Sequence, residues 1–87
     1  MKKITMFTME GCPYCREALR FIDELYKTDK RYTEIPFEKI DEKKQPEIAE
    51  EYDYYYVPTF YVGEIKMHEG ASTLQKVKHV FDEALKP

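Results

Sequence analysis

The spacing of apolar and polar residues divides the chain into short strands and helices. Residues 3–8 are rich in residues that favour strands and end at Glu10-Gly11, which predicts a first strand followed by a loop. Apolar residues then recur every three or four positions, the spacing of an amphipathic helix. These positions are Ala18, Leu19, Ile22, Leu25 and Tyr26. Pro13 suits the first position of this helix, and the polar residues 27–31 predict its end.

The middle of the chain predicts a second strand and a weaker helix. Residues 33–40 alternate between apolar and polar types, and Pro36 restricts this strand to a sheet edge or to its own start. Residues 41–52 predict a helix with Pro46 near its first turn. The residues expected to point inward are Ile35, Phe37 and Ile40 from the strand, and Ile48, Ala49 and Tyr52 from the helix.

The last third of the chain predicts a hairpin and a closing helix. Residues 59–62 and 65–67 form two short strands joined at Gly63-Glu64, and the helix begins at Ala71 or Ser72. The apolar positions of this helix are Leu74, Val77, Val80, Phe81 and Leu85. The resulting order is β-α-β-α-β-β-α, in which the first β-α-β unit favours a right-handed parallel crossover. We therefore expect an α/β fold with one mixed sheet and helices on both faces.

Composition narrows the class of protein. With 87 residues, the chain forms one domain over 1–87, and its eight Tyr and five Phe can build a core without a metal or disulfide. The 14 Lys and Arg against 17 Asp and Glu leave no excess of positive charge for nucleic acid. No apolar run approaches a membrane span, and residues 4–9 are too short for the core of a signal peptide. We therefore expect a cytoplasmic monomer that binds neither nucleic acid nor a membrane.

The only two cysteines, Cys12 and Cys15, lie at the predicted junction of first strand and first helix. At the helix cap, Cys12 would face unpaired backbone N–H groups and the positive end of the helix dipole, which lower a thiol pKa. Glu10 would oppose this effect, although exposure to water would screen most of its charge. Cys15 shares the apolar helix face and is expected to be more buried. The pair predicts thiol–disulfide exchange, with Cys12 attacking and Cys15 resolving.

Other uses of these residues stay open. A zinc site needs two further ligands, and His68 and His79, which we place on exposed surfaces, lack the close spacing of a zinc finger, so we expect no metal. A purely structural disulfide this short would restrain the unfolded chain only slightly. A redox-inert binding module would display the tyrosines of residues 52–56 as anchors. We favour the interpretation that alternate rings cover the second helix and the sheet edge.

Three motifs together resemble the glutaredoxin family over essentially the whole chain: Cys12-Pro13-Tyr14-Cys15, Val57-Pro58 and Glu69-Gly70-Ala71-Ser72-Thr73. The resemblance implies a thioredoxin fold, with a four-stranded mixed sheet, the first and third helices on one face, the second on the other, and a cis Pro58. It also implies reduction of protein disulfides and glutathione mixed disulfides, with glutathione as co-substrate and no tightly bound cofactor. The residues implied to bind glutathione or a peptide are Tyr14, Val57, Pro58, Gly70, Ala71 and Ser72.

The chain departs from the family pattern for glutathione. Met9 stands where the family has a lysine for the glycyl carboxylate, Glu69 replaces a glycine, and Ser72 replaces the aspartate for the γ-glutamyl ammonium. Two lost charge-assisted contacts, at roughly 1.5–3 kcal/mol each, would weaken glutathione binding by about two orders of magnitude or more. We therefore keep a second hypothesis, a glutaredoxin-like electron donor to disulfide-containing proteins that thioredoxin reductase reduces without glutathione.

Overall fold

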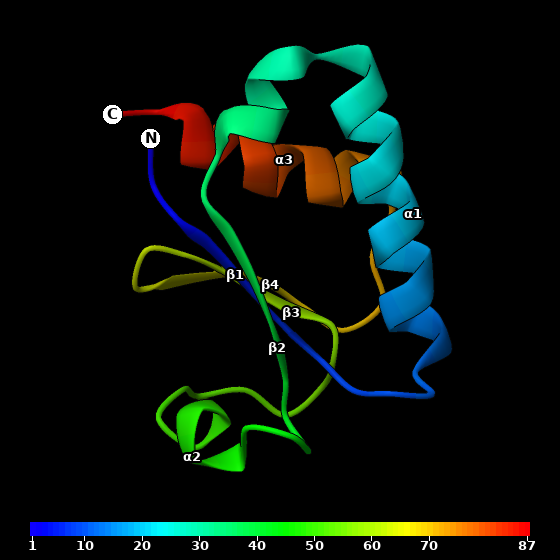
Figure 1. Ribbon diagram of the computed structural model, residues 1–87, viewed down its shortest axis with the longest axis vertical. Helices are drawn as coiled ribbons and strands as arrows, with labels where there is room; N and C mark the ends of the chain where they lie inside the picture. The colour runs from blue at the N-terminus through cyan, green and yellow to red at the C-terminus, as the bar shows by residue number, and fades with distance from the viewer.

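A four-stranded sheet forms the centre of the computed structural model, which describes residues 1–87 (Figure 1). The strands are β1 (Ile4–Thr8), β2 (Phe37–Asp41), β3 (Thr59–Val62) and β4 (Ile65–Glu69). The helices are α1 (Pro13–Thr28), α2 (Pro46–Ala49) and α3 (Leu74–Leu85), with a 3-10 helix, η1 (Lys30–Glu34), between α1 and β2. The predicted α/β class and the order of strands and α-helices are confirmed. No helix is both long enough and apolar enough to cross a membrane.

The sheet is mixed, with the strand order β2-β1-β3-β4. β1 pairs in parallel with β2, which places Ile4 opposite Phe37, and antiparallel with β3. The antiparallel β3–β4 pair shifts its register between Phe60 and Tyr61. β2 occupies an edge of the sheet, which agrees with Pro36 directly before its first residue.

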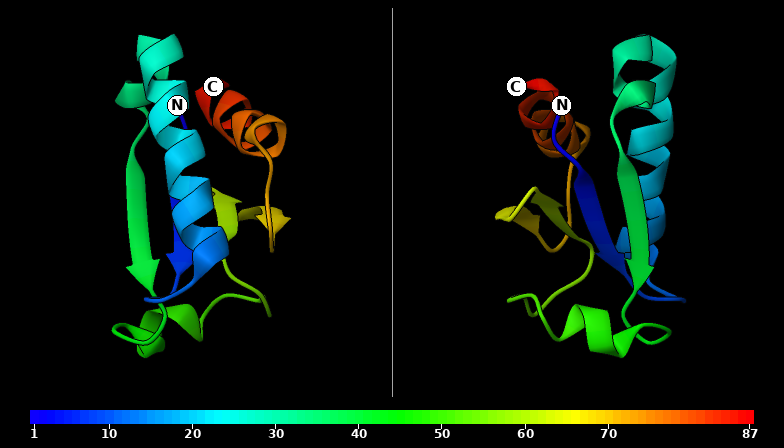
Figure 2. Two further views of the ribbon diagram at one scale, coloured as in Figure 1. Left: turned by 90° about the vertical axis from the view of Figure 1, so that its right-hand side faces the viewer. Right: turned by 60° about the vertical axis from the view of Figure 1, so that its left-hand side comes forward.

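Alternation along the strands divides the core between two faces of the sheet. Ile4 and Met6 belong to the larger cluster, which packs against α1 and α3, whereas Phe7 belongs to a smaller cluster beside α2. The larger cluster also contains both cysteines, and its α3 members are Val77, Val80, Phe81 and Ala84. Figure 2 shows α1 and α3 next to each other, with α2 apart from them near the end of β1 and β2. The layers implied by the family resemblance are confirmed.

The tyrosines of residues 52–56 divide into two groups. Tyr52 and Tyr54 pack on Phe7, with ring centroids 4.7 Å and 4.8 Å from that of Phe7. Tyr55 and Tyr56 are 86% and 70% exposed. The expected alternation therefore ends at Tyr54, and two adjacent rings face solvent.

The second strand is shorter than predicted. It begins at Phe37 because residues 30–34 form η1, which is capped by Asp29. The Asp29 carboxylate accepts the backbone N–H of Arg31 at 3.0 Å and pairs with its guanidinium at 2.7 Å. This local bonding competes with extension of the strand, so the prediction of a strand start at residue 33 is wrong.

The second helix is also shorter than the predicted range of 41–52. Asp41 ends β2, and its Oδ1 accepts the backbone N–H groups of Lys43 and Lys44 at 2.9 Å and 3.3 Å. These bonds form a turn in place of the first helical residues, and the helix covers only Pro46–Ala49. Ala49 is buried, as predicted for the apolar side of this segment.

Candidate active site

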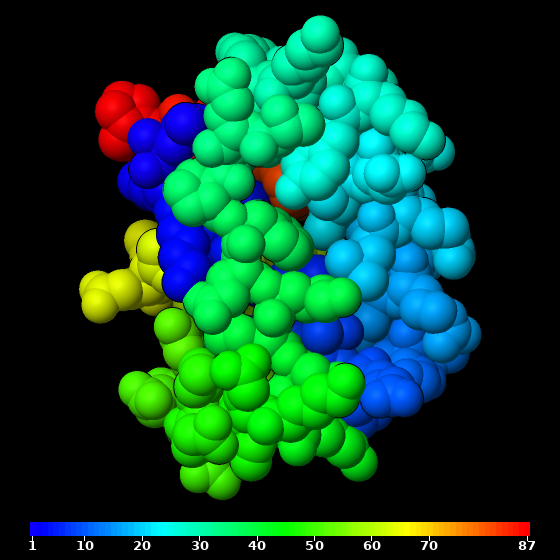
Figure 3. Space-filling model, in the orientation of Figure 1, coloured from blue at the N-terminus to red at the C-terminus, as the bar shows by residue number.

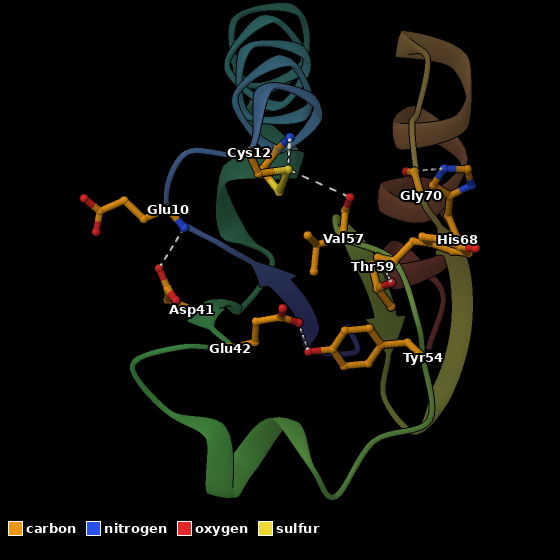
Figure 4. The surroundings of a disulfide bond; sticks show 11 residues. Glu10, Cys12, Asp41, Glu42, Tyr54, Val57, Thr59, His68 and Gly70 are labelled. Atoms are coloured by element: carbon orange, nitrogen blue, oxygen red, sulfur yellow. Dashed lines mark hydrogen bonds between the residues drawn. A yellow bond between two sulfur atoms is a disulfide. The ribbon is translucent and has the colours of Figure 1, made fainter.

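Cys12 is the N-cap residue of α1, and Pro13 takes the first helical position. The backbone of Cys12 is extended, with φ −91° and ψ 109°, and its Sγ accepts the N–H of Cys15 at 3.1 Å (Figure 4). The first turn of α1 contains no acidic residue. A disulfide joins Cys12 and Cys15, whose Cα atoms are 5.2 Å apart. The pair is thus arranged across the first turn of the helix, with the sulfur of Cys12 at the positive end.

The two cysteines are both buried and differ mainly in their position on the helix. Cys12 is 7% exposed and Cys15 is 2% exposed, and both belong to the larger core cluster. Ala18 and Ile22, also buried in that cluster, follow Cys15 along α1 at helical spacing. The helix N-terminus supplies a donor to the sulfur of Cys12, whereas Cys15 continues the apolar face of the helix.

Glu10 does not bring its charge to the cysteines. Its side chain is 82% exposed and extends away from Cys12 (Figure 4). Lys44 Nζ lies 3.8 Å from the Glu10 carboxylate. Solvent and a neighbouring cation therefore screen the Glu10 charge, so that it destabilises a Cys12 thiolate less than its place in the sequence predicts.

Asp41 connects the loop before Cys12 to the turn after β2. Its Oδ2 accepts the backbone N–H of Glu10 at 3.1 Å, while Oδ1 accepts those of Lys43 and Lys44. The backbone N–H of Lys43, and then those of Lys44 and Glu10, hold the pKa of Asp41 below its ordinary value. A charged carboxylate therefore joins two segments that border the cysteines.

An open cavity of about 650 Å³ lies beside the disulfide, on the side of β2. Figure 3 shows its two walls, the start of α1 and the segment after β2, meeting at the lower right. Arg16, Lys39 and Lys44 line it, together with Met9 and both cysteines. Glu10 and Asp41 line it as well, so side chains of both charges border the cavity, and none of the positive ones stands at residue 9.

Val57 and Pro58 border Cys12 on the opposite side from the cavity. The Val57–Pro58 peptide bond is cis, which confirms the implication of the family resemblance. The carbonyl oxygen of Val57 lies 3.9 Å from Cys12 Sγ (Figure 4). Pro58 is buried, and its carbonyl accepts the N–H of Gly70 at 2.8 Å. The second and third motifs of the sequence are therefore neighbours in space.

The segment before α3 is held by His68. The Nε2–H of His68 donates to the carbonyl oxygens of Gly70 and Ala71, at 3.1 Å and 2.9 Å. Gly70 has φ +90°, a left-handed conformation that glycine adopts without strain. The prediction of an exposed His68 is wrong, because its ring is half-buried and supports the segment that follows β4. Tyr14, in contrast, is 57% exposed at the start of α1.

Thr73, and not Ser72 or Ala71, caps the last helix. Thr73 has an extended backbone, and its Oγ1 accepts the N–H of Lys76 at 3.2 Å, so α3 begins at Leu74. The hydroxyl of Ser72 is buried and has no hydrogen-bond partner. The predicted helix start is wrong by two or three residues, because the neighbouring hydroxyl occupies the capping position.

Glu69 is a residue near the site whose contacts the sequence did not predict. One of its oxygens accepts the backbone N–H groups of Tyr55 and Tyr56, and the other pairs with Lys66 Nζ at 2.7 Å. Lys66 and these two N–H donors lower the pKa of Glu69 to about 2. The only signal in the sequence was that Glu69 stands where the family has a glycine.

The site combines a disulfide-forming cysteine pair, a helix N-terminus and a neighbouring backbone carbonyl. This arrangement is suited to exchange between a dithiol and a disulfide. No group of three or more His, Cys, Asp or Glu side chains is arranged to hold a metal ion.

Comparison with solved structures shows the same fold in thioredoxins. Oxidised thioredoxin from Plasmodium falciparum is 26% identical, with a TM-score of 0.72 over 97% of this chain and 81% of that chain. Mitochondrial thioredoxin 3 from Saccharomyces cerevisiae is 22% identical, with a TM-score of 0.74 over 94% and 77%. Thioredoxin O1 from Arabidopsis thaliana is 23% identical, with a TM-score of 0.72 over 99% and 79%. The sheet and its flanking helices therefore form a thioredoxin fold.

Comparison with protein families gives a more specific assignment. A search of curated protein sequences gives no match. The family model for glutaredoxin matches residues 4–66, which contain Cys12, Cys15 and Val57-Pro58, whereas the segment from Glu69 to Thr73 lies outside the match. The family, the fold and the joined cysteines together indicate a dithiol oxidoreductase. The chain belongs to the glutaredoxin family.

Proposed function

We propose that this protein reduces disulfide bonds in other proteins and mixed disulfides with glutathione, using Cys12 as the nucleophile and Cys15 as the resolving thiol. The observation that carries the proposal is the position of Cys12 Sγ at the N-cap of α1, where it accepts the N–H of Cys15 at 3.1 Å. The same N–H and the helix dipole stabilise a negative charge on this sulfur once the disulfide is reduced.

The reaction moves two electrons from the protein dithiol to the substrate disulfide. The Cys12 thiolate attacks one sulfur of the substrate and forms a mixed disulfide, while the other substrate sulfur leaves as a thiolate and takes up a proton. Cys15 then loses its proton and attacks Cys12 Sγ, which releases the second substrate thiol. The product is the Cys12–Cys15 disulfide, the bond that the structure contains.

The proposed substrate-binding residues surround Cys12 on the side of Val57. An extended substrate would pair with the backbone of Val57 and contact the exposed ring of Tyr14. Gly70 and Ala71 form the adjoining surface, and the buried Pro58 supports it by accepting the N–H of Gly70. A contact between Ser72 and substrate stays a prediction.

Two electron donors fit different features of the site. Arg16 and Lys39 line the cavity beside the cysteines and offer positive charge to a carboxylate of glutathione, our first candidate, whereas Lys44 lies beside Glu10. Met9 and the buried Ser72 offer no charge where the family binds glutathione, which favours the second candidate, reduction by thioredoxin reductase.

Parallel turnover assays distinguish the two donors. Hydroxyethyl disulfide and insulin are each supplied with NADPH and either glutathione plus glutathione reductase or thioredoxin reductase alone. Turnover with the first system supports glutathione dependence, and turnover with the second alone supports a reductase-coupled donor. A chemically reduced protein that fails to reduce either disulfide even stoichiometrically overturns the proposed function.

A further inference from the structure

The loop before Val57 is held by a carboxylate from the end of β4. Glu69 Oε2 accepts the backbone N–H of Tyr55 at 2.5 Å and that of Tyr56 at 2.9 Å. Neither N–H donates to a backbone carbonyl, so Glu69 is the acceptor for both. The next residue is Val57, whose carbonyl oxygen is 3.9 Å from Cys12 Sγ. One side chain therefore fixes the two residues that lead to the backbone beside the reactive sulfur.

The acceptor is anionic and is itself held in place. Lys66 Nζ contacts the other Glu69 oxygen at 2.7 Å and the carbonyl of Asp53 at 3.3 Å. The Glu69 side chain is 18% exposed, which limits the competition from water. Hydrogen bonds to a charged acceptor are stronger than those to a neutral one.

A second contact holds the same loop through its carbonyl group. Thr59 lies opposite Glu69 in the β3–β4 pair, and its hydroxyl donates to the carbonyl of Tyr56 at 2.5 Å (Figure 4 shows Thr59 beside this loop). Both backbone groups of Tyr56 are thus bonded, while the rings of Tyr55 and Tyr56 face solvent. The backbone is fixed and the aromatic side chains are exposed beside the site.

We propose that Glu69 is a positioning residue for substrate binding, because its carboxylate fixes the Tyr55–Val57 backbone beside Cys12. The inference rests on the proposed function, in which Val57 pairs with an extended substrate. Such pairing needs the N–H and carbonyl of Val57 to point in a fixed direction. If the loop were mobile, ordering it would cost conformational entropy and substrate binding would be weaker. The glycine that the family has at this position has no side chain to supply these contacts.

Variants of the Glu69–Lys66 pair distinguish the effect of the hydrogen-bond acceptor from the effect of its charge. Glu69→Ala removes the acceptor for both N–H groups together with the ion pair. Glu69→Gln keeps an oxygen that accepts both N–H groups but lacks the charge, and Lys66→Met keeps the carboxylate without its cation. Glu83→Ala is the matched control. It removes the ion pair between Glu83 in α3 and Lys86 just after α3, whose partners are three residues apart, as Lys66 and Glu69 are.

The first measurement is single-turnover reduction of insulin by the pre-reduced protein, over a range of insulin concentrations. We expect Glu69→Ala to raise the half-saturating concentration about tenfold, with Glu69→Gln and Lys66→Met within about threefold of the wild type. The maximal rate, the rate of Cys12 alkylation by iodoacetamide and the Glu83→Ala control should stay near wild type. An unchanged half-saturating concentration in Glu69→Ala, or an equal loss in alkylation rate, overturns the proposal.

The second measurement is amide hydrogen exchange of Tyr55 and Tyr56, which needs no substrate. Both amides should be protected in the wild type and in Glu69→Gln, and should lose protection in Glu69→Ala. Exchange of the wild-type amides at the rate of an unstructured chain overturns the proposal even if Glu69→Ala does not fold. If the wild type reduces neither insulin nor hydroxyethyl disulfide, the proposed function fails, and amide exchange still reports whether the carboxylate holds the loop.

Discussion

On each side of the cysteine pair, one carboxylate holds the nearby backbone by accepting its N–H groups. The two carboxylates differ in how far along the sequence their hydrogen-bond donors lie. On the cavity side, Asp41 accepts two N–H groups from its own turn and one from Glu10. On the Val57 side, Glu69 accepts both of its N–H groups from a loop that precedes it by 13 and 14 residues. The cavity side thus combines two local bonds with one that spans 31 residues, whereas both Glu69 bonds on the Val57 side depend on the packing of β4 against the loop.

Removing Cys12, where both sides meet, should have the largest effect. We expect Cys12→Ser to abolish reduction of insulin and of hydroxyethyl disulfide with glutathione, because the N-cap sulfur is the proposed nucleophile. Cys15→Ser should keep part of the glutathione-dependent activity, in which a single thiol suffices, and lose insulin reduction. Equal losses in the two variants would contradict the assignment of separate roles to the two sulfurs.

Two charges with which the family binds glutathione are missing from this chain, one on each side of the cysteine pair. Restoring each charge in turn tests which side can bind glutathione. Met9 lines the open cavity, so Met9→Lys places an ammonium beside solvent and should lower the KM for glutathione about tenfold. Ser72 is buried with an unpartnered hydroxyl, so Ser72→Asp would bury a charge there and should destabilise the fold without a comparable gain. Steady-state kinetics with glutathione reductase and thermal unfolding measure these effects.

A matching control keeps this test specific. Lys86→Met changes the charge by one far from the cavity, so it should leave the KM for glutathione unchanged. A fall in KM with Ser72→Asp and none with Met9→Lys would show that the Val57 side, and not the cavity side, is ready to bind a charged group.

Protonation of Glu69 at low pH should weaken its hydrogen bonds to Tyr55 and Tyr56, although the uncharged carboxyl still has an oxygen that accepts them. The pKa of Glu69 is lowered from 4.5 to about 2, so its contribution to stability is present above pH 4.5 and is lost as pH falls through about 2. We expect the amide resonances of Tyr55 and Tyr56 to shift in this window. Glu69→Gln, which has no proton to gain there, should remove the transition. A shift centred near pH 4.5 would show that neither Lys66 nor the two N–H donors stabilise the Glu69 carboxylate in solution.

Local signals in the sequence predicted the parts of the fold that depend on near neighbours. Helical spacing gave α1, Pro13 and Cys12 placed its start, and Pro36 placed β2 at an edge. Ser72 and Thr73 show the limit of such signals. Both hydroxyls are suited to cap a helix, but only that of Thr73 accepts an N–H of the first turn, while that of Ser72 is buried without a partner.

Contacts that depend on strand register were not predictable in this way. Glu69 reaches Tyr55 and Tyr56 from the end of β4, and the β3–β4 pair shifts its register after Phe60. His68 bonds to carbonyl groups whose direction follows from the left-handed Gly70. No spacing along the chain encodes these contacts, since they require the path of the loop in space.

Tyr54 links the two sides and gives the smallest expected effect. Its hydroxyl donates to Glu42 Oε1 at 2.8 Å, so the loop before Val57 is joined to the turn that follows Asp41 (Figure 4). Burial, and then the bond to Glu42, raise the pKa of Tyr54 above its ordinary value. Tyr54→Phe keeps the ring that stacks on Phe7 and removes only this bond. The free energy of unfolding should therefore fall by about 0.5–1.5 kcal/mol.

Denaturant unfolding of Tyr54→Phe, with Tyr26→Phe as control, measures the strength of this link. Tyr26 packs edge to face on Phe81, on the other face of the sheet, and its hydroxyl makes no side-chain hydrogen bond, so its loss should have little effect. If both variants unfold at the same denaturant concentration as the wild type, the Tyr54–Glu42 bond contributes nothing in solution. The two sides of the cysteine pair would then be coupled only through the sheet and through Cys12 itself.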